Sequence, residues 1–393
     1  MDHYKYIIIG GGMTGDAAVK GIREIDKDGS IAMISLEAHP PYSRPPLTKG
    51  LWKNTLEEKI WKKTEDQNVN LILNSKAERI GIDRSVSLAS GEKLHYDKLL
   101  LATGGLVNKL PFSGNNIIYY RTYDDYKRLR QLAENKNDFV VVGGGFIGSE
   151  IAAALAMNGK KVKMIFPDKL ICGKIFPKDL AEFINSYYKG KGIELINEDI
   201  VKDIRNHDDK EVITTRSGKT LTADAVVAGI GIKPNTKLAE QASITVDNGI
   251  VVSELLKANY PNIFAAGDAA NFYNPLLDKR IRVEHEDNAN KMGKHAGRAM
   301  AGDEVPYEYL PFFYSDLFEL GYEAVGELDS SLVTYSDWKE KFSEGVVYYL
   351  AGDQVRGVLL WNVWGQIDEA RKMIGETGHF NLEDLKGRLP VKK

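Results

Sequence analysis

The chain has 393 residues, enough for two or three domains, and its 43% hydrophobic and 27% charged residues are typical of a soluble globular protein. A net charge of −3 gives no large basic field, so the composition argues against nucleic-acid binding. No apolar run approaches the roughly 20 residues that span a bilayer, and the first predicted strand leaves no room for a signal peptide. We therefore expect a cytoplasmic protein without a membrane span.

Cys172 is the single cysteine of the sequence. A disulfide within the chain and a C-x-x-C redox pair are both excluded, and the dithiol chemistry that depends on such a pair is excluded with them. We expect Cys172 to be a small structural residue rather than a nucleophile. The seven histidines show no metal-ligand spacing, so we expect no metal site.

The first predicted element is a strand at residues 6–9, which leads directly into Gly-Gly-Gly-Met-Thr-Gly at residues 10–15. A G-x-G-x-x-G sequence between a strand and a helix predicts a dinucleotide site. Its glycines allow a tight turn, close approach of a pyrophosphate to the backbone, and close helix–strand packing, while N–H groups of the helix bind the phosphates. Residues 31–36 predict the second strand, and Glu37 at its end is expected to bind the ribose hydroxyls.

A proline-rich segment, Pro-Pro-Tyr-Ser-Arg-Pro-Pro-Leu at residues 40–47, follows the second strand. Proline fixes φ and removes a hydrogen-bond donor, so we expect a rigid loop at the mouth of the first site. A helix is expected to start near Leu47 or Thr48. Residues 99–101 predict a buried strand that ends in a turn of small residues at 102–105.

The same pattern begins again about 130 residues later. A strand at residues 139–142 leads into Gly-Gly-Gly-Phe-Ile-Gly at residues 143–148, and a strand at residues 161–166 is followed by Asp168. The helix after the second glycine motif is nearly all apolar apart from Glu150, and a carboxylate in such surroundings needs a partner. We interpret this segment as a second dinucleotide site.

The first pattern then resumes. A strand starting at residue 263 leads into Asp268, and Arg-Val-Glu-His at residues 282–285 opens a helix that runs to about residue 300. From residue 306 onward, aromatic and alternating segments predict a small antiparallel sheet followed by a helix. The predicted fold is therefore α/β, with two Rossmann-like dinucleotide-binding domains, the second inserted in the first, and a C-terminal α+β domain. The predicted boundaries are 1–111 with 232–305 for the first domain, 112–231 for the second and 306–393 for the third.

The order of first glycine motif, Ala-Thr-Gly, second glycine motif and Gly-Asp resembles the FAD-dependent pyridine nucleotide oxidoreductases of the glutathione-reductase type. Pro-Tyr-Ser-Arg-Pro-Pro-Leu-Thr-Lys at residues 41–49 resembles their ferredoxin-reductase-like members. Arg-Val-Glu-His-Glu-Asp at 282–287, Gly-Tyr-Glu-Ala-Val-Gly at 321–326 and Val-Leu-Leu-Trp-Asn at 358–362 are similar to the apoptosis-inducing-factor group and its prokaryotic members. The resemblance covers nearly the whole chain.

The resemblance implies FAD in the first domain and NADH or NADPH in the second. It implies cofactor-binding roles for Gly10, Gly12, Gly15, Glu37, Arg44, Lys49, Ala77, Thr103, Gly104, Gly143, Gly145, Gly148, Asp168, Gly231, Asp268, Glu284, His285 and Tyr314. It also implies a catalytic pair, with Lys49 near flavin N5 and Glu150 as its partner, linking the two cofactor domains. Tyr314 stands where the group has a tryptophan, which departs from the expected pattern.

These residues predict an FAD-dependent NAD(P)H oxidoreductase in which the protein supplies proximity and electrostatics for hydride transfer. NADH is favoured, because Asp168 would hold a 2′-hydroxyl and repel a 2′-phosphate, although Lys163, Lys169 and Lys174 are close enough in sequence to bind that phosphate. The candidate acceptors are a ferredoxin, a rubredoxin, a quinone or oxygen. The alternative is a slow-turnover NADH-sensing flavoprotein whose reduced form changes its oligomeric state, for example to a homodimer, and its partners.

Overall fold

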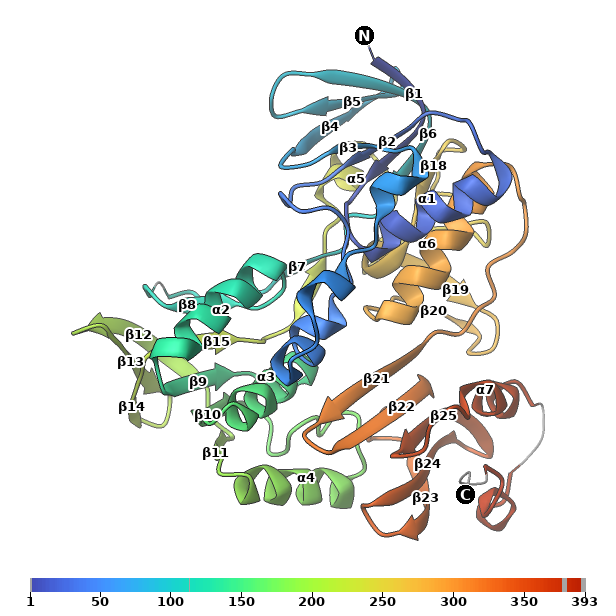
Figure 1. The fold of residues 1–393 in the computed structure, drawn as a ribbon. Coiled ribbons are helices and arrows are strands. Elements are labelled where there is room, and N and C mark those ends of the chain that lie inside the picture. Colours follow the sequence, from blue (N-terminus) through green and yellow to red (C-terminus); the bar gives the residue numbers. More distant parts are fainter. Residues whose placement is uncertain (1, 113, 377–379, 390–393) are drawn as a thin grey trace. The chain divides into compact units, whose positions relative to one another are not determined.

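Figure 1 shows a computed structural model that describes residues 2–112, 114–376 and 380–389. The chain forms two compact units. The first unit contains residues 1–43, 56–106 and 233–312, and the second contains residues 44–55, 107–232 and 313–393. The three-domain boundaries drawn from the sequence stay a prediction.

The first unit is built on a seven-stranded sheet in the order β3-β2-β1-β6-β5-β4, with β18 paired to β6. Its strands are β1 (Asp2–Ile9), β2 (Ile31–Ile34), β3 (Asn70–Ile72), β4 (Ala77–Gly81), β5 (Ser85–Leu88), β6 (Lys93–Leu101) and β18 (Ile263–Ala265). β1 pairs in parallel with β2 and with β6, and β18 pairs in parallel with β6. Because β18 comes after the whole second glycine-motif segment, that segment is inserted in the first, as predicted.

Helices α1 (Met13–Ile25) and α6 (Glu286–Met300) lie side by side in the first unit (Figure 1). Small residues allow this close approach. A Cβ atom at Gly21 would lie 2.0 Å from the carbonyl oxygen of Lys294, and one at Gly297 would lie 2.0 Å from that of Ala18. The unit also contains α5 (Lys237–Gln241), 3₁₀ helices at Glu57–Ile60, Thr64–Gln67 and Gly267–Ala269, and a sheet of β17 (Ile250–Val251), β19 (Ala270–Asn274) and β20 (Lys279–Ile281).

The second unit contains a five-stranded parallel sheet in the order β11-β10-β9-β15-β8. Its strands are β8 (Ile117–Tyr119), β9 (Asp138–Val142), β10 (Lys161–Phe166), β11 (Glu194–Asn197) and β15 (Ala225–Ala228), and its helices are α2 (Tyr123–Asn135), α3 (Phe146–Met157) and α4 (Lys178–Gly190). An antiparallel sheet of β12 (Val201–His207), β13 (Lys210–Thr215) and β14 (Thr220–Ala223) is attached to it. β7 (Gly105–Val107) and β16 (Ile232–Pro234) form a two-stranded sheet.

The C-terminal part of the second unit is a five-stranded sheet in the order β21-β22-β25-β24-β23, followed by a helix, as predicted. Its elements are β21 (Phe312–Leu317), β22 (Leu320–Gly326), β23 (Val333–Glu340), β24 (Glu344–Ala351), β25 (Gln354–Trp361), α7 (Ile367–Gly375) and a 3₁₀ helix at Leu382–Leu385. β24 and β25 are buried along most of their length, and Trp361 packs against the rings of Phe176 and Tyr322.

The helix predicted to start near Leu47 or Thr48 is wrong. The segment forms two 3₁₀ helices, Pro45–Leu47 and Gly50–Lys53. Thr48 and Lys49 donate their backbone N–H groups to the carbonyl oxygens of Pro45 and Pro46, three residues back, and Lys49 itself has non-helical angles of φ −126° and ψ −92°. Successive prolines remove N–H donors, and the chain turns again at Lys49 instead of continuing as an α-helix.

Gly21 sets the distance between α1 and α6, so we expect Gly21→Ala to destabilise the protein. The new Cβ would overlap the Lys294 carbonyl and force the helices apart, at a cost of about 1–3 kcal/mol. The measurement is the midpoint of thermal unfolding. The control is Gly190→Ala at the end of α4, where a Cβ atom meets nothing within 4 Å and the midpoint is expected to stay or rise. Equal midpoints for Gly21→Ala and the wild type would contradict this account.

Candidate functional site

The first glycine loop connects β1 to α1 by a turn that only glycine fits at its start. Gly10 has φ +129°, and a Cβ atom there would lie 2.0 Å from the carbonyl oxygen of Ala102 at the end of β6. A Cβ atom at Gly15 would lie 2.2 Å from the Gly10 carbonyl oxygen. α1 begins after Gly12, and no side chain caps its N-terminus. The N–H groups of its first turn therefore remain for an anion such as a pyrophosphate.

Glu37 lies in the loop after β2, and its carboxylate is held by a residue that the sequence interpretation did not single out. The hydroxyl of Tyr42 donates to Glu37 Oε2 at 2.5 Å. The carbonyl oxygen of Glu37 accepts the N–H of Asn74 at 3.1 Å, and Ala77 follows three residues later as the first residue of β4. Tyr42 therefore fixes the direction of the acid that is predicted to bind the ribose.

Three further predicted positions lie around the same glycine loop. Thr103 donates its hydroxyl to the carbonyl oxygen of Asn235 at 2.6 Å, and Asn235 N–H returns to the carbonyl oxygen of Gly104. Gly267 packs on Thr14 at the start of α1, which places Asp268 beside that helix. The first unit thus gathers Gly10, Gly12, Gly15, Thr103, Gly104 and Asp268 at one edge of its sheet.

The start of α6 continues this group. His285 is its N-cap residue, without a side-chain cap hydrogen bond, and Glu284 precedes it. One guanidinium nitrogen of Arg282 donates two hydrogen bonds. One goes to the carbonyl oxygen of Asp268 at 3.1 Å, and the other goes to the carboxylate of Glu284 at 2.5 Å. Arg282, to which the sequence interpretation assigned no role, therefore joins the Asp268 turn to the opening of α6.

The second glycine loop repeats the geometry of the first. Gly143 has φ +117°, and a Cβ atom there would lie 2.3 Å from the carbonyl oxygen of Gly229, while one at Gly148 would lie 2.1 Å from that of Gly143. Gly145 differs, because a Cβ atom there would meet nothing within 4 Å. Gly145 is the N-cap residue of α3, which also has no side-chain cap. The space over the helix start is therefore open, as a pyrophosphate requires.

Asp168 and Gly231 flank this second loop. Asp168 follows β10, and its carboxylate lies 3.7 Å from the ammonium group of Lys174, with both side chains exposed. Gly231 follows β15 with φ +86°, and its carbonyl oxygen accepts the N–H of Asn108. Both positions therefore lie beyond the carboxyl ends of parallel strands, where open α/β sheets bind their ligands.

A buried ion pair lies within the second unit. Lys49 Nζ is 2.6 Å from Glu150 Oε1, and the two side chains are 12% and 5% exposed. The predicted contact is present. The segment 44–55 that carries Lys49 is anchored in this unit, because Trp52 Nε1 and the Tyr120 hydroxyl both donate to the Leu47 carbonyl oxygen.

Two other predicted residues accompany that segment. Arg44 donates to the carbonyl oxygen of Arg121 at 2.9 Å. The Tyr314 ring centroid lies 5.5 Å from Lys49 Nζ, so Tyr314 gives the ammonium group an aromatic face. The second unit therefore gathers Arg44, Lys49, Glu150 and Tyr314, and the roles assigned to all of these residues stay predictions.

Cys172 is buried, and burial raises the pKa of its thiol to about 12. Its backbone N–H donates to the carbonyl oxygen of Gly144, so the residue packs beneath the second glycine loop. The thiol is protonated near neutral pH, which makes it unreactive and agrees with a structural role. Among the described residues no group of three histidine, cysteine, aspartate or glutamate side chains could hold a metal ion.

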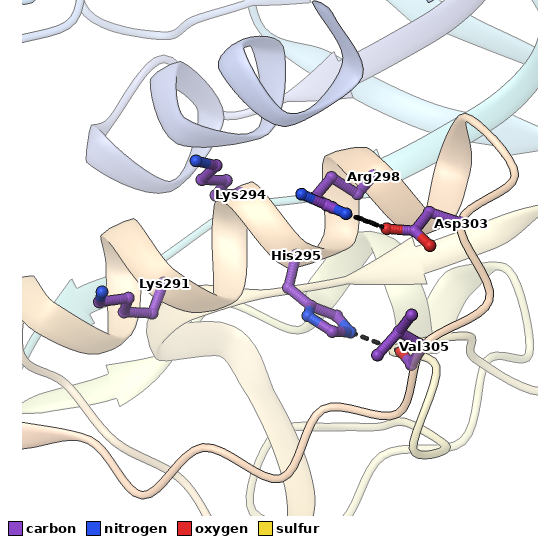
Figure 2. Close-up of a pocket in the computed structure, with 6 residues that line it drawn as sticks. All are labelled: Lys291, Lys294, His295, Arg298, Asp303 and Val305. Carbon is purple, nitrogen blue, oxygen red and sulfur yellow. Dashed lines mark hydrogen bonds and ion pairs between the residues drawn. The ribbon is translucent and has the colours of Figure 1, made fainter. Parts of the chain in front are cut away.

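Figure 2 shows a pocket of about 200 Å³ on the outer face of α6, lined by Lys291, Lys294, His295, Arg298, Asp303 and Val305. Two of its cations are paired with acidic side chains. Arg298 binds Asp303 at 2.6 Å, and Lys294 binds Glu24 at 2.6 Å. None of the predicted site residues lines this pocket, and its charges are largely neutralised within the protein, so it gains no functional assignment.

Within the ranges that the structure describes, no helix is both long and apolar enough to cross a membrane. The cytoplasmic location stays a prediction.

Comparison with known proteins extends the likeness over the whole chain. Residues 4–293 match the family described as pyridine nucleotide-disulphide oxidoreductase, and residues 296–339 and 336–376 match the C-terminal family of mitochondrion-associated apoptosis-inducing factor. The chain is 35% identical to mitochondrial apoptosis-inducing factor 1 of Dictyostelium discoideum, over 98% of this chain and 80% of that protein. It is 33% identical to monodehydroascorbate reductase 3 of Arabidopsis thaliana, over 91% and 89%.

Among solved structures, the covalent putidaredoxin reductase–putidaredoxin complex superposes on this chain with a TM-score of 0.89 at 30% identity, covering 95% of this chain and 93% of that one. The predicted fold class is confirmed by this likeness.

Because a side chain at Gly145 would meet open space, a substitution there can test nucleotide binding without disturbing the fold. The backbone angles of Gly145, φ −88° and ψ −166°, suit any residue, so Gly145→Val is expected to fold and to keep its thermal midpoint. Its side chain would fill the space over the start of α3 and raise the dissociation constant for the nicotinamide dinucleotide about tenfold or more. Isothermal calorimetry checks this. In contrast, Gly143→Ala is expected to impair folding. Unchanged nucleotide affinity in Gly145→Val would refute the assignment of the second loop.

Proposed function

The chain belongs to the pyridine nucleotide-disulphide oxidoreductase family and is an FAD-dependent NAD(P)H oxidoreductase, and we propose that NADH is its donor and a small ferredoxin-type protein its acceptor. The observation that carries the proposal is the pair of glycine loops with the same geometry, each followed by a helix whose N-terminus no side chain caps. Such loops fit two pyrophosphates in one chain, one for FAD and one for the nicotinamide dinucleotide.

We propose separate tasks for the residues of the two loops. The N–H groups after Gly12 and Gly145 bind the two pyrophosphates, and Glu37, oriented by Tyr42, binds the adenosine ribose of FAD. When bound, FAD supplies the hydride acceptor and passes the electrons on. In the first unit, Asp268 and the start of α6 bind the remainder of that cofactor. In the second unit, Lys49, held by Glu150, is the positive charge that the resemblance to the family assigns to the flavin.

The preference for NADH rests on charge around Asp168. This carboxylate repels a 2′-phosphate and suits two free ribose hydroxyls. Two of the lysines that would otherwise favour NADPH face acids, since Lys163 lies 3.4 Å from Glu194 and Lys174 lies 3.7 Å from Asp168 itself. These pairs reduce the positive charge available for a 2′-phosphate.

The acceptor must take electrons without a protein dithiol, because Cys172 is the one cysteine in the sequence and is buried. The likeness to putidaredoxin reductase in complex with putidaredoxin supports a ferredoxin-type partner. Rubredoxin, a quinone, oxygen and a small organic acceptor, as in the name monodehydroascorbate reductase, are the competing acceptors. A homodimer also stays a prediction.

The donor is tested by adding NADH or NADPH to the purified protein without air and following the flavin absorbance. NADH is expected to bleach the flavin at least about tenfold faster at equal subsaturating concentration, because the acid disfavours the 2′-phosphate. The matched variant Asp168→Ser is expected to narrow this ratio. Faster bleaching by NADPH would reverse the donor assignment, and no bleaching by either nucleotide would refute hydride transfer.

The acceptor is tested by adding air, a quinone, a ferredoxin or a rubredoxin to the NADH-reduced protein. Rapid return of the flavin absorbance with a ferredoxin, and slow return with the others, is the expected result. The alternative function is a slow-turnover NADH sensor, which the match to the C-terminal apoptosis-inducing-factor family over residues 296–376 favours. That function predicts slow return with every acceptor and a change in oligomeric state on NADH addition, measured by light scattering.

A further inference from the structure

The carboxylate of Glu150 accepts three short hydrogen bonds, all within the second unit. Lys49 Nζ donates to Oε1 at 2.6 Å, Ser315 Oγ donates to Oε1 at 2.5 Å, and Thr48 Oγ1 donates to Oε2 at 2.5 Å. Glu150 belongs to α3, Thr48 and Lys49 to the segment between the two 3₁₀ helices, and Ser315 to β21. One carboxylate therefore ties together three segments that are far apart in the sequence.

The two hydroxyl groups come from residues next in sequence to Lys49 and to its aromatic neighbour. Thr48 directly precedes Lys49 in the chain, and Ser315 directly follows Tyr314, whose ring lies 5.5 Å from the Lys49 ammonium group. The Thr48 hydroxyl also lies 3.2 Å from the Pro45 carbonyl oxygen, but its single proton has the nearer acceptor in Glu150. Both hydroxyl protons are thus directed at Glu150, the partner of Lys49, while the Thr48 oxygen also accepts a long hydrogen bond from Lys49 Nζ at 3.5 Å.

The division of donors between the two carboxylate oxygens has a chemical consequence. A carboxylate has about four acceptor positions, and a buried one is costly unless these positions are filled. Neutral hydroxyl groups fill two of them without adding charge. Lys49 then gives Glu150 one of its three N–H groups and directs another at Thr48 Oγ1 in a long contact of 3.5 Å, so that its third N–H group remains for a ligand. Without Thr48, Oε2 would lose its donor and would draw the ammonium group across to bridge both oxygens.

We propose that Thr48 and Ser315 are positioning residues that hold Glu150 so that Lys49 keeps an N–H group for the flavin. The inference rests on the proposed function, because Lys49 acts there on the cofactor. Neither hydroxyl touches the reacting atoms, so each works through Glu150. Thr48 has the larger effect, since it supplies Oε2, whereas Oε1 keeps Lys49 when Ser315 is removed.

The test removes each hydroxyl group in the presence and in the absence of the Glu150 carboxylate. Thr48→Val and Ser315→Ala are made in the wild type and in a Glu150→Gln background, and the rate of flavin bleaching by saturating NADH is measured on the FAD-loaded proteins. Thr48→Val is expected to slow bleaching about tenfold, as expected for a hydrogen bond to a charged group. Ser315→Ala is expected to slow it less, and Thr48→Ser is expected to retain the wild-type rate. In the Glu150→Gln background, the same substitutions are expected to change the bleaching rate by no more than roughly twofold relative to Glu150→Gln alone. This difference between the two backgrounds would show that the hydroxyl groups act through Glu150.

The matched control is Ser217→Ala, which removes a hydroxyl 2.5 Å from Asp199, another buried carboxylate of the second unit. It is expected to leave the bleaching rate unchanged. Bleaching by Thr48→Val and Ser315→Ala at the wild-type rate, or equal slowing in both backgrounds, would overturn the inference and leave the hydroxyls a purely structural role. If Thr48→Val does not fold, the Ser315→Ala pair of proteins decides.

A second readout needs neither cofactor nor turnover. The apoprotein is treated with acetic anhydride, and acetylation of Lys49 is compared by mass spectrometry with that of Lys191, which pairs with Glu319 elsewhere in the second unit. Thr48→Val is expected to slow Lys49 acetylation several-fold, because Oε2 of Glu150 would take up another N–H group of Lys49. In the Glu150→Gln background, Thr48→Val is expected to leave the acetylation rate of Lys49 unchanged. An unchanged rate would overturn the inference. Failure of the wild type to bleach with either nucleotide would refute the proposed function instead, while the acetylation result still decides the positioning.

Discussion

The structure depends on a backbone contact that excludes a side chain. At Gly10 and at Gly143 the carbonyl oxygen of a neighbouring strand end occupies the place of a Cβ atom, at 2.0 Å and 2.3 Å. Each contact brings the loop down onto the end of the sheet, so that the following helix starts directly above the strands. The helix N-terminus is left without a side-chain cap in both cases. An anion is the partner that such an N-terminus favours, because the unpaired N–H groups and the helix dipole act together.

Around these loops, polar side chains form hydrogen bonds to the backbone and to one another. Tyr42 holds Glu37, Arg282 joins Glu284 to the Asp268 turn, and Thr103 bonds to the backbone of Asn235. These are contacts that fix direction, since each restrains a group at the edge of the sheet where a ligand would bind. Preorganisation of this kind lets a site act by proximity and electrostatics rather than by proton transfer, as hydride transfer requires.

The sequence predicted the strand, turn and helix at each glycine motif, which depend on adjacent residues. It did not predict hydrogen bonds between distant hydroxyl residues and Glu150, or the 3₁₀ helices of the proline-rich segment. Each glycine motif directly follows an apolar run, so its strand, turn and helix could be read from adjacent residues. The pairing of Lys49 with Glu150 came from a resemblance and is present in the structure. Tyr42 and Thr48 stand in the motif at residues 41–49, but no role could be assigned to them or to Ser315, because a hydroxyl residue near a loop or on a strand has many uses. Ser315 lies 165 residues from Glu150 in the chain, and only the fold shows that they meet. The helix expected near Leu47 failed because hydrogen bonds between residues three apart replaced the α-helical pattern.

The free energy of folding alone does not explain the buried Lys49–Glu150 pair. Apart from Ser149, the other buried positions of α3 are apolar, with Ile151, Ala152 and Leu155 fully inaccessible. Replacing a buried ion pair by hydrophobic residues is often neutral or stabilising, so packing gives no reason for a carboxylate at this position. Its charge is balanced by an ammonium group, and two more of its acceptor positions are filled by hydroxyls, all drawn from other segments. The role proposed for the pair in the reaction would account for its presence. A lysine in the interior keeps a fixed direction and a positive charge only if an acid is buried with it, and α3 supplies that acid one turn after the second glycine loop.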